Sequence, residues 1–383
     1  MKNFKRTVFS AFIIALAILV SGCGMIQVNE EKDRKQIVAT VNGQEIKKGE
    51  VLDQYISFYG ETDEYDKEIL KDILDSMIEE KLLKQKAEAA GHVVNDEVRK
   101  QASEDFEQAI KDYAEALKKE AGEDADPDTD YEQKAREEYE KFISDSGRTK
   151  EEYLELIAEY LAIKNYLDEL TADVTVEDKE IEEYYQEELD FQKENPTLAA
   201  YYSSVNIVTK PASRTVKHIL IKLSDEDFKE ISKLRQDGKE DEANALREEK
   251  LKSIEAKAQD VLKKAKGGEN FDILIEKYGE DPGMESEEYK DGYKMLRDAN
   301  MVEEFLEASF TMQKDEISGL VPSDYGYHII KVYEANEDEI ASLDEVREDI
   351  KNLLLDRKKS EKADDLIDQW LEEADIKKYE NRL

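Results

Sequence analysis

VKHILI at residues 216–221 and GYHIIKV at residues 326–332 are the two stretches that best predict the fold of this 383-residue chain. Both are short apolar runs rich in β-branched residues, which is typical of β-strands. They carry His218 and His328, two of the three histidines of the chain. Alternate residues of a strand share a face, so each histidine lies on the face of the apolar residue two positions further on. We therefore expect two neighbouring core strands that bring the imidazoles together.

The sequence between the two strands helps to separate two interpretations of the histidines. A histidine on an apolar strand face is often only a hydrogen-bonded core residue. Here, however, the connection has a definite order of elements. We expect an amphipathic helix at residues 252–266, a turn at Gly267-Gly268, a second helix starting near Asn270, a loop containing Asp281 and a short helix at residues 302–310.

This order is similar to that of the parvulin peptidyl-prolyl isomerases over about residues 213–334. The matching pieces, in the same order, are HILI (218–221), GGENF (267–271), MVEEFLEASF (301–310), EIS (316–318) and YGYHII (325–330). The resemblance implies an antiparallel sheet with helices. It implies a catalytic group made of His218, Asp281 and His328. It also implies a substrate-binding group made of Leu296, Met301, Phe305 and Ser323.

Two residues depart from the family pattern and leave two functions open. The glycine turn of the family appears here as KDGYKML (290–296), in which Leu296 stands where relatives carry an aromatic pocket residue. Tyr325 stands where many relatives carry a small hydroxyl residue, although Ser323 matches a hydroxyl position. Rotation about an X-Pro bond breaks no covalent bond, so the reaction needs no nucleophile. The first hypothesis is an active isomerase. The second is a binding chaperone that retains the parvulin fold without turnover.

The amino terminus predicts export and a lipid anchor. Lys2, Lys5 and Arg6 precede an apolar run at residues 8–20, which is the pattern of a secretory signal peptide and is short for a membrane-spanning helix. Cys23, the only cysteine, follows small residues, in close resemblance to a bacterial lipobox. We expect a lipoprotein signal peptide at 1–22, lipidation at Cys23 and residence on the extracytoplasmic face of the cell membrane. A single cysteine allows no intramolecular disulfide.

Charge limits the possible partners. The formal net charge is −39, with 39% charged residues, so nucleic acid is not an expected partner. The acidic residues are spread through helix-like sequence, which favours solvated helix faces over one electrostatic binding patch. We expect no cofactor and no metal site, because three histidines and one cysteine give no ligand cluster at suitable spacing. A lipoprotein solute receptor is a third hypothesis, but the chain lacks the alternating strand and helix pattern of such receptors.

The flanks of the parvulin-like segment predict one further domain made from both ends of the chain. Two short strands surround Asn42-Gly43, a strong hairpin signal, and helical sequence follows as far as Leu170. Near the carboxyl end, an apolar helical stripe extends from Val346 to Leu371 and needs a surface to pack on. We expect this helix to return to the amino-terminal helices, with the parvulin-like unit inserted between them.

With the flanks included, the chain resembles extracytoplasmic foldases of the PrsA type and, more distantly, SurA chaperones. The predicted fold class is α+β: a discontinuous, mainly helical chaperone domain with an inserted antiparallel sheet and helices. The predicted segments are 1–22 (signal peptide), 23–35 (tether), 36–210 (first part of the chaperone domain), 211–335 (parvulin-like domain) and 336–383 (terminal helix). The resemblance implies unfolded or partly folded secreted proteins as partners. A homodimer would cover apolar surface of the helical domain.

The segment 224–250 is a polar insertion after the first parvulin strand, and we expect it to be helical. It borders the predicted active-site mouth. A solvated spacer is the favoured interpretation, and screening of clients by charge is the alternative.

Overall fold

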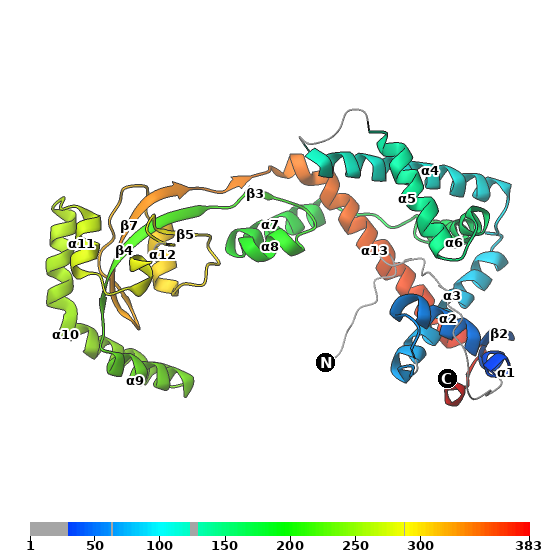
Figure 1. The fold of residues 1–383 in the computed structure, drawn as a ribbon, viewed down its shortest axis with the longest axis horizontal. Coiled ribbons are helices and arrows are strands. Elements are labelled where there is room, and N and C mark those ends of the chain that lie inside the picture. Colours follow the sequence, from blue (N-terminus) through cyan, green and yellow to red (C-terminus); the bar gives the residue numbers. More distant parts are fainter. Residues whose placement is uncertain (1–29, 63, 123–128, 287) are drawn as a thin grey trace. The chain divides into compact units, whose positions relative to one another are not determined.

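The computed structural model describes residues 30–62, 64–122, 129–286 and 288–383 (Figure 1). Within the described residues, contacts fall into two compact units. The first, which we call the end-to-end unit, combines residues up to Thr175 with Leu355–Leu383. The second, the central unit, is Val176–Leu354. The predicted signal peptide, Cys23 and the first part of the tether lie outside the described residues.

The end-to-end unit begins with the predicted hairpin, which is confirmed. Strands β1 (Ile37–Val41) and β2 (Gln44–Lys47) are antiparallel. Asn42 and Gly43 connect them with φ angles of 49° and 85°. Two successive positive φ angles match the right-handed twist of a hairpin, and Asn-Gly adopts them readily. On its other edge β1 pairs with β9 (Ile376–Lys378), which is close to the carboxyl end.

Helices make up most of the end-to-end unit. They are α1 (Glu30–Arg34), α2 (Lys48–Tyr59), α3 (Lys67–Ala89), α4 (Asp96–Ala121), α5 (Tyr131–Asp145), α6 (Lys150–Leu170) and the carboxyl-terminal part of α13 (Leu343–Glu373). Four of these helices begin where a side chain accepts the free N–H groups of the first turn. These capping residues are Asp66, Asn95, Asp130 and Thr149. A short 3₁₀ helix, η3 (Glu380–Arg382), follows β9.

The core of this unit joins the two ends of the chain. Trp370 of α13 is buried and stacks on Tyr166 of α6, with 5.8 Å between ring centroids. Ile367 of α13 lies in the same cluster as β1 and α3. Near the carboxyl end, the Arg382 guanidinium donates to the backbone oxygen of Ile37 over 2.7 Å. The helical domain is therefore discontinuous, as the sequence predicted.

The central unit contains a four-stranded antiparallel sheet in the order β5-β4-β7-β6. Its strands are β4 (Ser213–Lys222), β5 (Tyr293–Met295), β6 (Val321–Ser323) and β7 (Gly326–Asn336). The helices are α7 (Asp178–Glu194), α8 (Pro196–Tyr202), α9 (Asp225–Gln236), α10 (Glu240–Lys266), α11 (Phe271–Tyr278) and α12 (Glu303–Thr311), with the 3₁₀ turn η2 (Pro282–Glu285). Strands β3 (Val208–Lys210) and β8 (Glu339–Ile340) form a separate pair.

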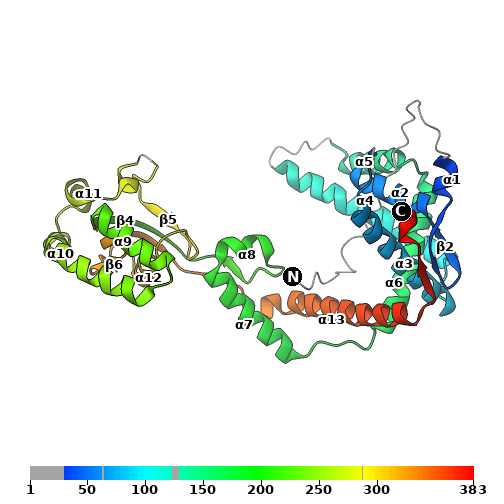
Figure 2. The ribbon, with the colours of Figure 1, turned by 90° about the horizontal axis from the view of Figure 1, so that it is seen from below.

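Helices cover both faces of the four-stranded sheet (Figures 1 and 2). Ile219 and Ile329 belong to the cluster with α10 and α11. Val216 and Ile330 belong to the cluster with Phe305 of α12. Because side chains alternate along a strand, His218 and His328 share the α12 face with Val216 and Ile330. The sheet therefore presents both histidines to α12.

Segment 224–250 differs from a solvated spacer. It forms α9 and the first half of α10, and one face of this pair is buried. Ile231 and Ala243 are fully buried and pack with Leu251 and with Tyr327 of β7. The insertion is therefore a packed part of the central unit, which places its polar residues at fixed positions.

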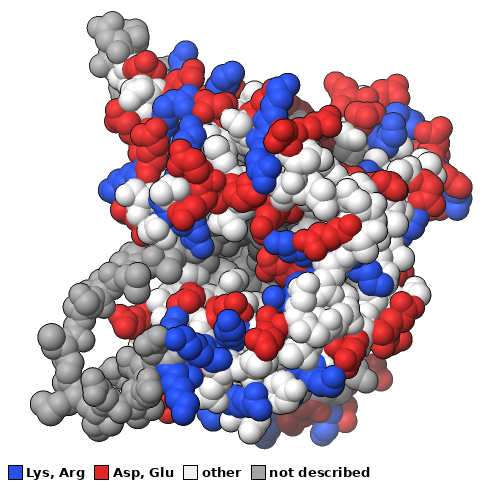
Figure 3. Space-filling view, turned by 90° about the vertical axis from the view of Figure 1, so that its right-hand side faces the viewer, with Lys and Arg blue, Asp and Glu red and all other residues white. Residues whose placement is uncertain are grey.

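Surface charges of both signs are mixed, and neutral side chains lie among them, on the face drawn in Figure 3. The described residues also contain ion pairs between successive helical turns, for example Lys179 with Glu183 at 2.8 Å. Exposed pairs of this kind contribute little to stability. Within the described ranges, no helix is long and apolar enough to cross a membrane.

Candidate active site

The two strand histidines meet at the centre of the candidate site. In the register of β4 and β7, His218 lies opposite Ile330, and His328 lies opposite Leu220. This diagonal arrangement brings the two Nδ1 atoms to 3.1 Å, with the rings stacked at 21° and their centroids 5.2 Å apart. Both side chains are buried. Sequence alternation alone predicted this meeting.

Asp281 lies on the outer side of His218. Its Oδ2 atom is 2.7 Å from Nε2 of His218 and accepts a second hydrogen bond, also 2.7 Å, from the Tyr293 hydroxyl. Its Oδ1 atom accepts from the backbone N–H of Gly283 at 3.2 Å. Asp281 is the residue before η2, so the turn that follows it supplies this N–H. The carboxylate therefore has three donors in fixed positions.

Ser323 lies on the far side of His328. Its hydroxyl oxygen is 2.7 Å from Nε2 of His328 and accepts a hydrogen bond from the backbone N–H of Tyr325 at 3.1 Å. Ser323 ends β6 and is fully buried. The polar groups thus form one continuous chain, in the order Tyr293, Asp281, His218, His328, Ser323 and the backbone of Tyr325.

One proton arrangement satisfies every group in this chain with both histidines neutral. His218 carries its proton on Nε2 and donates to Asp281, and His328 carries its proton on Nδ1 and donates to Nδ1 of His218. The Ser323 hydroxyl then donates to Nε2 of His328. In this arrangement each N–H or O–H has an acceptor, which buried polar groups require.

The electrostatics agree with this arrangement. Burial, reinforced by the charge that His218 would carry if protonated, lowers the pKa of His328 to about 3, so His328 is neutral at pH 7. Burial also acts to raise the pKa of Asp281. The hydrogen bonds from His218 and Tyr293 outweigh that effect, and the pKa of Asp281 lies well below its usual value. Burial and the bond to Asp281 raise the pKa of Tyr293, which keeps its hydroxyl protonated as a donor.

Apolar side chains from α12 and β5 surround the histidines. Phe305 is buried and meets both imidazoles edge-on, with centroid distances of 5.0 Å to His218 and 5.4 Å to His328. Met301 precedes α12 and is 36% exposed, so its side chain is accessible to a ligand. Leu296 is half-buried and lies outside the cluster around Phe305, to which β5 contributes Met295 and Tyr293.

A cavity of about 440 Å³ opens beside His218 and Asp281. It lies on the α11 side of the two residues, and Phe305 and Met301 do not line it. Its other lining residues include Met284, Tyr289 and Lys290. Phe305 and this cavity therefore lie on different sides of the histidine pair.

Tyr293 is a site residue that the sequence reasoning missed. Residues 290–296 were treated as an altered glycine turn, and Leu296 was chosen as the pocket residue. Strand alternation holds the signal: Tyr293 lies opposite Val216 and Met295 lies opposite Arg214, so both share the face of His218. Reading these residues as an edge strand identifies Tyr293 and Met295 as two further residues on the face of His218.

The order of serine, histidines and aspartate raises the question of hydrolysis. A serine nucleophile needs an adjacent base and also access to a substrate carbonyl. Ser323 has the base, His328, but its side chain is fully buried, so a substrate carbonyl has no access to its hydroxyl. Acyl transfer by Ser323 therefore has no support in this geometry. A reaction that needs only shape and fixed dipoles remains compatible with it.

Comparison with known families gives two matching domains, in agreement with the fold. Residues 202–336 match the family model of the PPIC-type PPIase domain, and residues 1–105 match that of the SurA-like N-terminal domain. The central unit therefore carries a peptidyl-prolyl isomerase domain of the parvulin type. Proteins named foldase protein PrsA are similar to the chain over its whole length, in agreement with the resemblance found in the sequence.

Individual relatives extend over the whole chain. The foldase protein PrsA of Clostridium botulinum strain Langeland is 29% identical over 401 residues, which covers 100% of both chains. The PrsA protein of C. botulinum strain Okra gives the same identity and coverage. Among solved structures, PrsA from Bacillus subtilis is similar over 88% of this chain and 93% of its own, with 19% identity and a TM-score of 0.21.

Proposed function

We propose that the protein is a membrane-anchored extracytoplasmic foldase that catalyses cis/trans isomerisation of X-Pro bonds and assists the folding of secreted proteins. The observation that carries the proposal is the hydrogen-bonded chain from Tyr293 to Ser323, against which Phe305 packs edge-on. The PrsA relatives, which are named foldases, support the role in folding.

The site suits a rotation better than a bond cleavage. Rotation about a peptide bond faces a barrier of about 18–20 kcal/mol, and its transition state is a twisted amide. Stabilisation of that state needs an apolar surface for the proline ring and fixed dipoles near the carbonyl and the nitrogen. Phe305 and the accessible Met301 offer the apolar surface. In the hydrogen-bonded chain from Tyr293 to Ser323, each N–H and O–H already has an acceptor. Its dipoles therefore need no reorganisation during the reaction.

The remaining parts have proposed roles as well. The end-to-end unit holds non-native segments of clients, and Cys23 carries the lipid that keeps both units at the membrane. The signal-like sequence before Cys23 supports this placement. The formal net charge of −39 argues against nucleic acid as a partner.

Exchange spectroscopy on a panel of proline-containing peptides tests the proposal. The mature protein should accelerate isomerisation, and the variants His218→Ala and Phe305→Ala should lose the acceleration. Met301→Ala should lose part of it while leaving the core intact, because Met301 is accessible. Arg99→Ala is the control, since Arg99 pairs with Glu155 in the other unit.

The alternative is a binding chaperone with a retained parvulin fold. If the unaltered protein accelerates no peptide yet suppresses the aggregation of an unfolded protein, that alternative replaces isomerase catalysis. Leu296, which lies outside the Phe305 cluster, is the observation that favours it. If the protein neither accelerates isomerisation nor suppresses aggregation, both proposed functions are excluded.

A further inference from the structure

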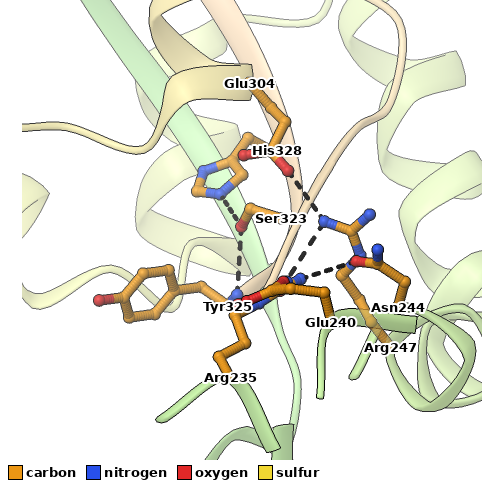
Figure 4. Close-up of polar contacts among 9 residues, drawn as sticks. Arg235, Glu240, Asn244, Arg247, Glu304, Ser323, Tyr325 and His328 are labelled. Atoms are coloured by element: carbon orange, nitrogen blue, oxygen red, sulfur yellow. Dashed lines mark hydrogen bonds and ion pairs between the residues drawn. The ribbon is translucent and has the colours of Figure 1, made fainter. Parts of the chain in front are cut away.

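Charged side chains of the 224–250 insertion hold the turn between β6 and β7 (Figure 4). Arg235, at the end of α9, donates to both carboxylate oxygens of Asp324, one of the two residues in that turn. One of these distances is 2.9 Å, from Nη2 to Oδ1. Arg235 also donates to Asn244 at 2.9 Å and to Glu240, both in α10. One guanidinium thus connects α9, α10 and the turn.

A second arginine connects the same turn to α12. Nη1 of Arg247 lies 2.9 Å from Oε1 of Glu304 and 3.7 Å from Oδ1 of Asp324. Glu304 immediately precedes Phe305, the aromatic residue that packs against both histidines. Arg247 therefore links the turn beside His328 with the helix that supplies the aromatic contact.

An aromatic stack holds the turn from another direction. Phe228 of α9 stacks on Tyr325 with 4.7 Å between centroids and 23° between planes. Tyr325 follows Asp324, and its backbone N–H donates to the Ser323 hydroxyl. The insertion therefore contacts both residues between Ser323 and Gly326, one through an ion pair and one through a ring.

The ion pairs of Arg235 and Arg247 fix the position of the turn between β6 and β7. A two-pronged arginine–carboxylate pair sets the orientation as well as the distance of its partners. Asp324 and Arg247 are about one-fifth exposed and Arg235 about one-quarter, so water screens the pairs less than it screens surface ion pairs. The 2.7 Å contact between Ser323 and His328 depends on where this turn lies. Displacement of a site group by about 1 Å can lower a rate by about a hundredfold.

We propose that Arg235 and Arg247 are positioning residues of the isomerase site, and that the insertion carrying them orients Ser323 against His328 and α12 against the histidine pair. Neither arginine touches the substrate in this proposal. It rests on the proposed isomerase function for its kinetic consequences. Its structural consequence, the position of the Ser323–His328 contact, is separate and can be measured without substrate.

The test is a double-mutant cycle between Arg235 and Asp324 in the mature protein. We expect Arg235→Ala, Asp324→Ala and the double variant each to lower kcat by about tenfold, a change of about 1.4 kcal/mol, with KM within about twofold of the wild-type value. Because all three variants break the same contact, the double variant should be no worse than the single ones. Arg235→Lys keeps the charge but loses the two-pronged geometry, and it should restore kcat in part.

The matched control is Arg99→Ala, which breaks a two-pronged pair with Glu155 (2.8 and 2.9 Å) in the end-to-end unit. It should leave kcat within about twofold, because Arg99 and Glu155 belong to the other compact unit. The ring nitrogen signals of His328 and the amide signal of Tyr325 supply the readout without substrate. Both should shift in Arg235→Ala and remain unchanged in Arg99→Ala.

The outcomes separate the two proposals. If folded Arg235→Ala and Asp324→Ala keep wild-type kcat, or if the His328 and Tyr325 signals do not move, the positioning role is overturned. If the wild-type protein has no isomerase activity, the proposed function fails, and the signals alone decide whether the insertion positions the turn. If the alanine variants do not fold, Asp324→Asn and Arg235→Lys are compared by the same measurements.

Discussion

The Nδ1 atoms of His218 and His328 lie 3.1 Å apart, although the two residues are 110 positions apart in the chain. One of the two nitrogens must donate and the other accept, because two N–H groups would face each other if both were protonated. The tautomer of one histidine therefore determines the tautomer of the other. With Asp281 accepting from His218, the proton between the rings is fixed on His328.

Replacement of Asp281 by asparagine should disturb that choice. The Oδ2 atom accepts from both His218 and Tyr293, while Oδ1 accepts from Gly283. An amide has only one acceptor oxygen, so in either orientation its NH₂ group faces a donor. We expect Asp281→Asn to lower kcat/KM by about tenfold or more, since a hydrogen bond to a charged group contributes about 1.5–3 kcal/mol. Isomerisation kinetics and the ring nitrogen shifts of His218 provide the measurement.

Tyr293→Phe is the matched comparison for this variant. It removes one donor to Asp281 and preserves the carboxylate and the bond from His218. The expected effect is smaller than that of Asp281→Asn, because only one of the three donors to the carboxylate is lost while its charge and the bond from His218 remain. An effect of Tyr293→Phe as large as that of Asp281→Asn would contradict the role given to the carboxylate.

The central unit should lose stability as the pH falls. The pKa of His328 is about 3 in the folded protein, whereas an unfolded histidine titrates near 6.5. Between these values the unfolded chain binds the additional proton, so the free energy of unfolding rises with pH. The slope from this group is at most about 1.4 kcal/mol per pH unit. Hydrogen exchange of β4 and β7 amides, measured between pH 7 and pH 5, provides the check.

His328→Asn supplies the control for the pH experiment. Asparagine does not titrate, so the slope between pH 7 and pH 5 should become shallower in this variant, whatever its effect on stability at pH 7. An unchanged slope would show that other groups, and not His328, cause the acid sensitivity of the sheet.

Gly326 is a position where the neighbouring backbone leaves no room for a side chain. Its φ is 141°, and an added Cβ would lie 2.1 Å from the backbone oxygen of Ile221 on the neighbouring strand. We expect Gly326→Ala to lower the free energy of unfolding of the central unit by about 2–4 kcal/mol, from backbone strain and overpacking. Gly319→Ala is the control, because nothing lies within 4 Å of its added Cβ. Equal stability of the two variants would contradict the steric account.

Replacement of Trp370 tests how much the packing of α13 stabilises the end-to-end unit. Trp370 is the only tryptophan, it is buried, and it stacks on Tyr166. Trp370→Ala should lower the stability of this unit by about 3–5 kcal/mol, as expected for loss of a buried aromatic ring. Trp370→Phe retains a ring and should cost less. Hydrogen exchange should report the loss at β1 and α3, and protection of β1 at the wild-type level would contradict the packing described here.

The features predicted correctly from sequence are those with a local periodic signal. Alternation in β4 and β7 is enough to place His218 and His328 on one face, and Asn42-Gly43 specifies its hairpin through backbone angles that few other residue pairs adopt. The apolar stripe of α13 requires a partner surface. It therefore predicts that this helix packs on the amino-terminal helices. Each of these inferences depends on one segment and its immediate pattern.

The contacts that escaped prediction join distant segments through residues that are common in this chain. Arg235 and Asp324 are 89 positions apart. With 56 basic and 95 acidic residues, very many pairings are equally compatible with the sequence. Tyr293 was missed for a different reason, because its strand has only three residues and was read as a turn. Charge pairing and very short edge strands carry little local information, since tertiary packing selects them.

The pairing of β1 with β9 has a consequence for the order in which a newly made chain can mature. In the chain β1 precedes residues 176–354 and β9 follows them, so β1 keeps an open edge until that whole stretch has been made. Residues 176–354 form one continuous stretch and are all present before that moment. A chain interrupted after residue 354 would therefore contain all residues of the central unit, whereas its amino-terminal part would lack the third strand of its sheet and Trp370.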